Sequence, residues 1–218
     1  SLSGAAVAGR IANKATNSYT FIGSGNANTV SSVYSTIVTG LGNTAICVNN
    51  FIGTGKYNLV SQNCAVIVGG IYNTASGQHS FIGAGSCNIS SNTRAVIGSG
   101  LSNTTSGTDS FIDTGCENTV SNTNSAIVTG RRNLVSSACS FMGGGCQNTG
   151  SGAFTVVVGG NTNVASGTCS VILGGSFNLV ASGVASGILA GTQNCMQHNC
   201  SFIIGSNLTS SANCTTFV

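Results

Sequence analysis

Residues 73–87 read "NTASGQHSFIGAGSC", and close variants of this 15-residue phrase return along almost all of the 218-residue chain. Asparagine marks the frame, because it recurs at the same constant interval from Asn13 to Asn178. A longer interval then leads to Asn194 and a shorter one to Asn207. A fixed short period over a whole chain predicts a solenoid, in which each repeat buries its apolar residues only against its neighbours.

Each repeat contains one large apolar residue nine positions after the frame asparagine, with few exceptions. We expect these residues to form an inward core ladder: Ile22, Ile37, Ile52, Ile67, Ile82, Ile97, Ile112, Ile127, Met142, Val157, Ile172, Ile188 and Ile203. Glycine follows three positions later, from Gly25 to Gly191, and Ser206 takes that place in the last repeat. A second small or β-branched residue, such as Val30 or Ala75, comes two positions after the asparagine.

Fifteen residues suffice for two short strands and two bends. The sequence therefore predicts an all-β fold, a parallel β-solenoid (β-roll) of about thirteen coils, with coils about 4.8 Å apart. We expect one domain over 1–218, with caps at 1–12 and 208–218 and repeats over 13–207. Glycine is expected where φ is positive or backbones approach closely. Asparagine is expected either in a left-handed corner or in a stacked amide ladder.

Three fragments, "NTASGQHS", "NTTSGTDS" and "NVASGTCS", are each followed by an apolar trio and G-x-x-N. They resemble the head repeats of YadA-type trimeric autotransporter adhesins and repeats in fibre or surface proteins of phages and large DNA viruses. The resemblance implies a left-handed parallel β-roll that forms trimers on an extracellular, cell or virion surface. It also implies adhesion, with a host-surface receptor or glycan as a partner.

The residues on either side of each core residue are also apolar, although neighbours in a strand point to opposite faces. Phe with Gly in one repeat alternates with a smaller residue and Val in the next, over much of the chain. A strand that is apolar on both faces is usually buried on both. We therefore expect a homo-oligomer, and the resemblance to adhesin heads implies that a trimer is favoured. The expected interface residues are Phe21, Phe51, Phe81, Phe111, Phe141, Phe202, Val38, Val68, Val128 and Val158. The alternative is a monomer with the flanks inside and the isoleucines outside, which would expose an apolar stripe.

The composition narrows the other function classes. Only 4% of residues are charged, the net charge is +3, and 41% are hydrophobic. This charge is too low for a nucleic-acid surface, and no apolar run reaches the roughly 18 residues of a membrane span. Two histidines and the absence of C-x-x-C argue against a zinc site. We expect no cofactor, no metal, no nucleic-acid partner and no membrane insertion.

The three acidic residues, Asp109, Asp113 and Glu117, lie within one repeat. Paired carboxylates can hydrolyse glycosides. Because the chain has only three acidic residues, we instead expect local ion pairs with Arg94 or Arg131. His79 and His198 are expected in solvent-facing corners. We therefore expect no catalytic residues and no enzymatic activity.

Several of the ten cysteines occupy equivalent positions in different repeats. One corner position holds Cys64, Cys139, Cys169 and Cys200, and another holds Cys116 and Cys146. Members of each set are two or more coils apart, at least about 9–10 Å, and a disulfide requires Cα atoms within about 7 Å. Pairs of unlike position such as Cys47 with Cys64, bridges between chains, and free thiols all remain open. We favour mostly free thiols.

A second function is suggested by Thr-x-Ser in the first strand of many repeats, for example Thr29 with Ser31 and Thr74 with Ser76. A regular uncharged Thr/Ser ladder resembles the ice-binding face of grass antifreeze β-rolls. Other residues interrupt the threonine column: Lys14, Leu59, Ile89, Leu134 and Leu179. Ice binding is therefore the alternative to a structural surface protein.

Overall fold

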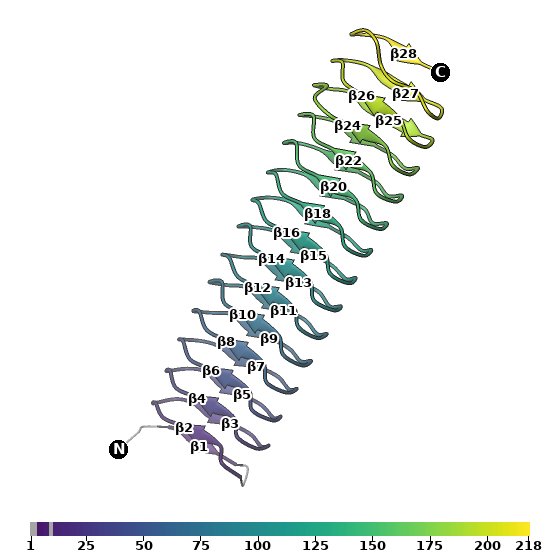
Figure 1. The fold of residues 1–218 in the computed structure, drawn as a ribbon. Helices are drawn as coiled ribbons and strands as arrows, with labels where there is room; N and C mark the ends of the chain where they lie inside the picture. The colour runs from purple at the N-terminus through teal and green to yellow at the C-terminus, as the bar shows by residue number, and fades with distance from the viewer. Residues whose placement is uncertain (1–3, 9–10) are drawn as a thin grey trace. The chain divides into compact units, whose positions relative to one another are not determined.

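The computed structural model describes residues 4–8 and 11–218, and it contains two compact units, Ser1–Asp109 and Ser110–Val218. Each unit is a stack of coils, and each coil contributes two short parallel strands (Figure 1). The described residues contain no helix. The predicted all-β parallel β-solenoid is confirmed, with about 14 coils instead of thirteen.

The first unit contains two sheets in which every strand pairs in parallel with the equivalent strand one coil away. One sheet contains β1 (Ala6–Val7), β3 (Phe21–Ile22), β5 (Thr36–Ile37), β7 (Phe51–Ile52), β9 (Val66–Ile67), β11 (Phe81–Ile82) and β13 (Val96–Ile97). The other contains β2 (Lys14–Ala15), β4 (Thr29–Val30), β6 (Thr44–Ala45), β8 (Leu59–Val60), β10 (Thr74–Ala75), β12 (Ile89–Ser90) and β14 (Thr104–Thr105). The register offset equals the sequence repeat, as in the pair Phe51↔Val66.

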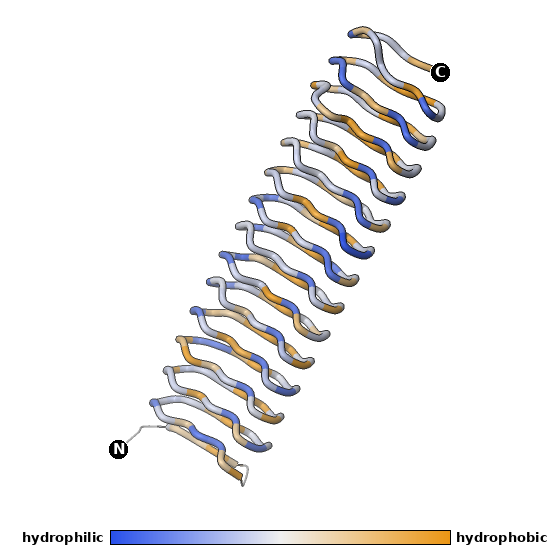
Figure 2. The backbone as a smooth tube through the Cα atoms, viewed as in Figure 1, coloured by the Kyte–Doolittle hydropathy of each residue, from blue (hydrophilic) through white to orange (hydrophobic). Residues whose placement is uncertain are grey.

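The second unit repeats this arrangement. Its first sheet contains β15 (Phe111–Ile112), β17 (Ala126–Ile127), β19 (Phe141–Met142), β21 (Val156–Val157), β23 (Val171–Ile172), β25 (Gly187–Ala190), β27 (Phe202–Ile204) and β28 (Thr216–Phe217). Its second sheet contains β16 (Thr119–Val120), β18 (Leu134–Val135), β20 (Thr149–Gly150), β22 (Val164–Ala165), β24 (Leu179–Val180) and β26 (Cys195–Met196). Figure 2 shows apolar residues along the strands and hydrophilic residues at regular intervals around the coils.

The core of each unit lies between its two sheets. Every residue of the core ladder is fully buried, at 0% exposure. The facing strands supply smaller residues, mostly Val and Ala, so the coils are narrow. Where the facing residue is Gly150, a Cβ would lie 4.0 Å from Met142 Cε. The long methionine side chain thus reaches toward the space left by the glycine, as expected for a close-packed interior.

The frame asparagines form a buried amide ladder. Asn28 Oδ1 accepts hydrogen bonds from the backbone N of Asn43 at 3.0 Å and from its Nδ2 at 3.2 Å. Asn43 Nδ2 also donates to the carbonyl oxygen of Gly55 at 2.9 Å. The left-handed alternative is wrong for these asparagines, because the positive φ belongs to the preceding residue, such as Ala27 at 57°. The asparagines are selected for their amides, since buried polar groups require partners.

The glycine that follows the core ladder satisfies two requirements at once. Gly55 has φ +110°, a conformation that side chains disfavour. A Cβ there would lie 2.0 Å from the carbonyl oxygen of Gly70 and 2.6 Å from Asn58 Nδ2. Both expected reasons for glycine therefore hold at this position, and the close approach permits the hydrogen bond from the ladder amide to a glycine carbonyl.

Two corner positions of each coil adopt the left-handed conformation, with φ between 51° and 59° wherever the residue is not glycine. The first corner column comprises Tyr19, Tyr34, Asn49, Cys64, His79, Arg94, Asp109, Asn124, Cys139, Phe154, Cys169, Ala185, Cys200 and Cys214. The second corner column comprises Ala12, Ala27, Gly42, Tyr57, Tyr72, Cys87, Ser102, Glu117, Arg132, Gln147, Thr162, Phe177, Gln193 and Asn207. Left-handed backbone is unusual outside Gly, Asn and Asp, yet most of these residues are of other types.

The extra residue between Asn178 and Asn194 lies in the bend 181–186, between β24 and β25. Ile188 still pairs with Ile172, and Ile188 is fully buried. The strand therefore keeps its phase, since a slip of one residue would have turned it to the other face.

The following coil is shorter than the frame predicted. The register between β25 and β27 shifts after Ile188, and the backbone N of Leu208 donates to Asn194 Oδ1 at 3.0 Å. Placing Asn207 in the ladder was therefore wrong, because Leu208 takes that position and Asn207 belongs to the second corner column. Placing Ser206 in the glycine position was also wrong, because Asn194 Nδ2 donates to the carbonyl oxygen of Gly205.

Candidate functional site

An apolar surface covers the outer side of the sheets that contain the core ladder. We call it the Phe/Val face, formed by the residues that flank each core residue. Phe21 is 41% exposed, Phe141 is 43% exposed and Val158 is 47% exposed. The remaining expected interface residues also point outward and are exposed or half-buried: Phe51, Phe81, Phe111, Phe202, Val38, Val68 and Val128. The alternative with the flanks inside is wrong, since the core ladder occupies the interior.

The alternation of large and small residues has a local cause. A Cβ at Gly53 would lie 3.5 Å from Cε1 of Phe51, and one at Gly23 would lie 3.3 Å from Cε1 of Phe21. These two rings thus lie beside the glycine two positions later in the same coil, an aromatic cover for a residue that has no side chain. Coils with a smaller first flank carry Val instead, as in Thr36 with Val38. The larger flanking side chain therefore precedes the core residue in one of these coils and follows it in the next.

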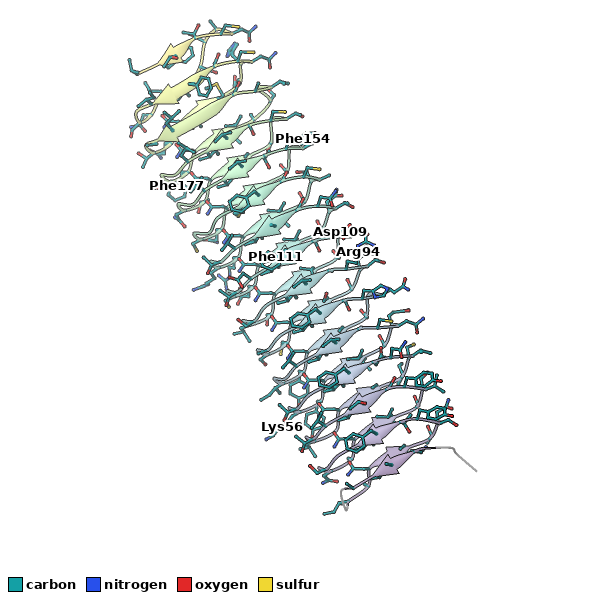
Figure 3. The ribbon with its side chains drawn as sticks, turned by 180° about the vertical axis from the view of Figure 1, so that it is seen from behind. Lys56, Arg94, Asp109, Phe111, Phe154 and Phe177 are labelled. Carbon is teal, nitrogen blue, oxygen red and sulfur yellow. The ribbon has the colours of Figure 1, made fainter. Side chains whose placement is uncertain are left out.

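Phe111 shows the one charged interruption of this pattern. Its ring lies on the sheet face in Figure 3, but the residue two positions later is Asp113, which is exposed. Asp113 is thus an outward residue of the Phe/Val face. A carboxylate there is solvated in the single chain and would require a partner if the face were covered.

The opposite sheets carry the threonine column. Its threonines are half-buried: Thr29, Thr44, Thr74, Thr104, Thr119 and Thr149. Lys14 and Ile89 interrupt the column and are exposed, whereas Leu59 and Leu134 are half-buried. The outer surface of these sheets is therefore an irregular mixture of hydroxyl and apolar groups.

Ion pairs join neighbouring coils within the corner columns. In the first unit, Arg94 Nε lies 2.5 Å from Asp109 Oδ1 and Nη2 lies 2.7 Å from Oδ2, and the two side chains point toward each other in Figure 3. The hydrogen bonds from Arg94 lower the pKa of the Asp109 carboxyl. Both side chains are exposed, 58% and 37%, so this geometry indicates a surface pair.

In the second unit, Arg132 Nε donates to Glu117 Oε2. These hydrogen bonds lower the pKa of the Glu117 carboxyl, and the positive charge of Arg131 lowers it further. The expectation of local ion pairs is therefore confirmed for Asp109, whereas the partner of Glu117 is Arg132 rather than Arg131. Asp109 belongs to the first unit, and Asp113 and Glu117 belong to the second.

Aromatic rings also stack along the corner columns. Tyr19 and Tyr34 have ring centroids 5.2 Å apart and planes inclined by 9°. Tyr57 and Tyr72 stack at 5.1 Å and 12°. In the second unit, Phe154 and Phe177 point outward at opposite edges of the coils (Figure 3), and each is 57% exposed.

Few groups suited to chemistry gather in the described part of the chain. His79 is exposed in the first corner column, and His198 Nδ1 lies 2.9 Å from Ser210 Oγ. All ten cysteines are free thiols. Among the described residues, no three His, Cys, Asp or Glu side chains come together as metal ligands would.

A shallow polar hollow of about 290 Å³ lies in the first unit beside the first corner column. Its lining residues are Gln62, Ser76, Gly77, Gln78, Ser91, Asn92 and Thr93. None of these side chains is charged, so the hollow offers only neutral hydrogen-bonding groups.

No protein-family model matches the chain, and no curated protein matches it. Within the described residues, no helix has the length and apolarity needed to cross a bilayer.

Proposed function

We propose that this protein is a structural surface protein whose β-rolls associate with one another through the Phe/Val face. The observation that carries the proposal is the apolar surface, present in each unit, on strands whose other side is already the core. Monomeric soluble proteins rarely leave a large contiguous apolar patch exposed. A second copy of the same chain is the partner that fits best, because the patch repeats with the coil spacing.

Covering the Phe/Val face with a second copy of the chain is energetically favourable. Full burial of a phenylalanine side chain contributes about 2 kcal/mol, so covering the exposed two fifths of a ring such as Phe141 contributes about 1 kcal/mol. The same gain recurs at other Phe and Val positions of the face. Bulk on alternate sides of neighbouring coils creates hollows and ridges, which suit close packing against a matching surface.

A closed trimer is the favoured assembly, as the resemblance to adhesin heads implies. Three rolls can each cover an edge of the Phe/Val face without leaving an open apolar surface, and closed symmetry is the rule among homo-oligomers. Exposure at a cell or virion surface and adhesion to a receptor or glycan complete the proposal. The uncharged polar hollow and the outward tyrosines are surfaces that such a partner could contact.

The test is a pair of double variants. Phe51→Asp with Phe141→Asp places two carboxylates on the Phe/Val face, where burying an unpaired charge is costly. We expect the wild-type chain to form an oligomer in sedimentation equilibrium, with three chains favoured. The face variant should fall to single-chain mass while its far-ultraviolet circular dichroism stays that of β-structure.

The matched control is Phe154→Asp with Phe177→Asp, which makes the same chemical changes at the corners. Those side chains are more exposed than the face residues, so the control should keep the wild-type mass. A wild-type chain that remains monomeric at the highest soluble concentration contradicts the proposal. Equal masses for wild type and the face variant contradict it as well.

Ice binding has weaker support, because Lys14 and Ile89 interrupt the threonine column and its threonines are half-buried. Thermal hysteresis measured on the same preparations separates the two functions. Hysteresis that disappears in Thr74→Leu with Thr104→Leu, but not in the face variant, would replace the structural proposal by the ice-binding one.

A further inference from the structure

The shortened coil near the C-terminal end places two cysteines at the same corner of consecutive coils. Phe202 pairs with Thr216, so the register offset there is one residue shorter than the ordinary repeat. Cys200 and Cys214 are separated by this same shortened interval. The backbone N of Cys214 donates to the carbonyl oxygen of Asn199 at 2.9 Å, which is the bond that this corner makes elsewhere. Cys214 therefore lies one coil beyond Cys200 in the first corner column.

Side chains of this column reach across one coil. Tyr19 and Tyr34 stack with ring centroids 5.2 Å apart. Asn49 Nδ2 lies 3.9 Å from the sulfur of Cys64. Side chains at this corner in consecutive coils thus lie beside each other. A cysteine sulfur in the column lies near the column side chain of the adjacent coil.

The backbone spacing suits a covalent bond. Equivalent residues in consecutive coils are about 4.8 Å apart, and disulfides join Cα atoms roughly 4.4–6.8 Å apart. Cys139 and Cys169 share the same column but are two coils apart, which is too far. Within the described residues, Cys200 and Cys214 alone occupy one column position in consecutive coils. The frame taken from the sequence did not place Cys214 in this column, because the last coil was placed one residue out of register.

The coil that contains Cys214 also lacks the ladder asparagine that the preceding coils possess. Leu208 occupies its ladder position, so the amide ladder ends with Asn194. A coil with fewer buried polar bonds opens more readily than its neighbours, and a covalent link would restrain it.

We propose that Cys200 and Cys214 form a reversible disulfide that fastens the last coil to the one before it. The oxidant is a low-molecular-weight disulfide. The thiolate of one cysteine attacks a sulfur of that disulfide and releases one small thiol. The second cysteine thiolate then attacks the mixed disulfide, forms the bond within the chain and releases the second small thiol. Two cysteine thiols are oxidised and one small disulfide is reduced to two thiols. Both Cys200 and Cys214 are exposed, which permits the attack.

The experiment uses the full chain with oxidised glutathione, followed by alkylation and peptide mapping without reduction. We expect one linked peptide pair, containing Cys200 and Cys214. Hydrogen exchange of the amides in residues 213–217 should slow by about tenfold on oxidation, and dithiothreitol should reverse the change. Cys169→Ser should behave like wild type, whereas Cys214→Ser should lose both the linked peptide and the change in exchange.

Other outcomes overturn the proposal. Glutathione attached separately to both cysteines, with no linked peptide, shows that the two sulfurs do not meet. A bridge between two chains, seen as a covalent dimer that Cys214→Ser abolishes, assigns the pair to assembly instead. A linked peptide that leaves the exchange of residues 213–217 unchanged excludes the fastening role.

Discussion

The buried amide ladder and the exposed corner columns run through the same coils, yet the sequence treats them differently. The ladder holds asparagine in nearly every coil, and these asparagines are buried from Asn28 to Asn194. The corner columns hold many residue types, although φ stays between 51° and 59° wherever the residue is not glycine. A buried hydrogen-bonding position thus requires one side chain. An exposed backbone conformation tolerates many, because its cost of about 1–2 kcal/mol per residue is offset by the bonds of neighbouring coils.

The largest effect is expected from breaking the ladder. Asn133→Ala removes the oxygen that accepts from the backbone N of Asn148 at 3.0 Å and from its Nδ2 at 3.2 Å. Buried donors are then left without partners, so the free energy of unfolding should fall by about 3 kcal/mol. Urea unfolding measures the change. Gln147→Ala, in the corner beside the ladder, should stay within about 0.5 kcal/mol of wild type. Equal losses in the two variants would erase the contrast between ladder and corner.

A smaller effect tests whether corner side chains cooperate. A double-mutant cycle of Tyr57→Ala and Tyr72→Ala should give a coupling of about 1 kcal/mol, because the rings stack. The same cycle on Tyr57 with Tyr34, which belong to different corner columns, should give none. Additive losses for the stacked pair would show that the rings contribute individually and not to each other.

The corner backbone itself offers a stabilising change. Thr162 is β-branched and has φ 54°, a combination that is strained. Thr162→Asn should raise the free energy of unfolding by about 0.5–1 kcal/mol, because Asn accepts this conformation more readily. The same replacement in a strand, Thr149→Asn, should lower it, since Asn is depleted in strands. A loss of stability in Thr162→Asn would show that the threonine side chain makes a contribution that outweighs its strain.

The smallest effect concerns the ion pairs. Arg94 lowers the pKa of Asp109, so the stabilisation is present above the ordinary carboxyl pKa, about 3.9. It is lost as the pH falls through the lower folded-state value. In Arg94→Gln, the pKa of Asp109 measured by NMR titration should rise, while that of Glu117 should stay low because Arg132 remains its partner. An unmoved Asp109 pKa would show that the pair does not persist in solution.

The repeat period predicted the coil, its two strands and the inward core ladder, because buried positions repeat one kind of residue. The glycine column was predictable for the same reason. The left-handed conformation of the corner columns was not, since many residue types occupy them and only the backbone shows that Phe154 and Cys169 share it. The sequence placed the last coil one residue out of register, because the repeat frame assigned the ladder position to Asn207. Leu208, the next residue, occupies that position. The self-association face followed from apolar residues on both sides of a strand, and it stays a prediction.

Within the described residues, Leu208 occupies the ladder position that follows Asn194. A stack of parallel coils leaves unpaired backbone groups at its end, which can template the addition of further β-strands. An asparagine at that end would offer a side-chain oxygen to the backbone of any incoming strand, as Asn194 offers its own to Leu208. Leucine offers no such acceptor. In Leu208→Asn the new amide oxygen would be able to accept a hydrogen bond from an added strand, so seeded, thioflavin-positive aggregation should increase.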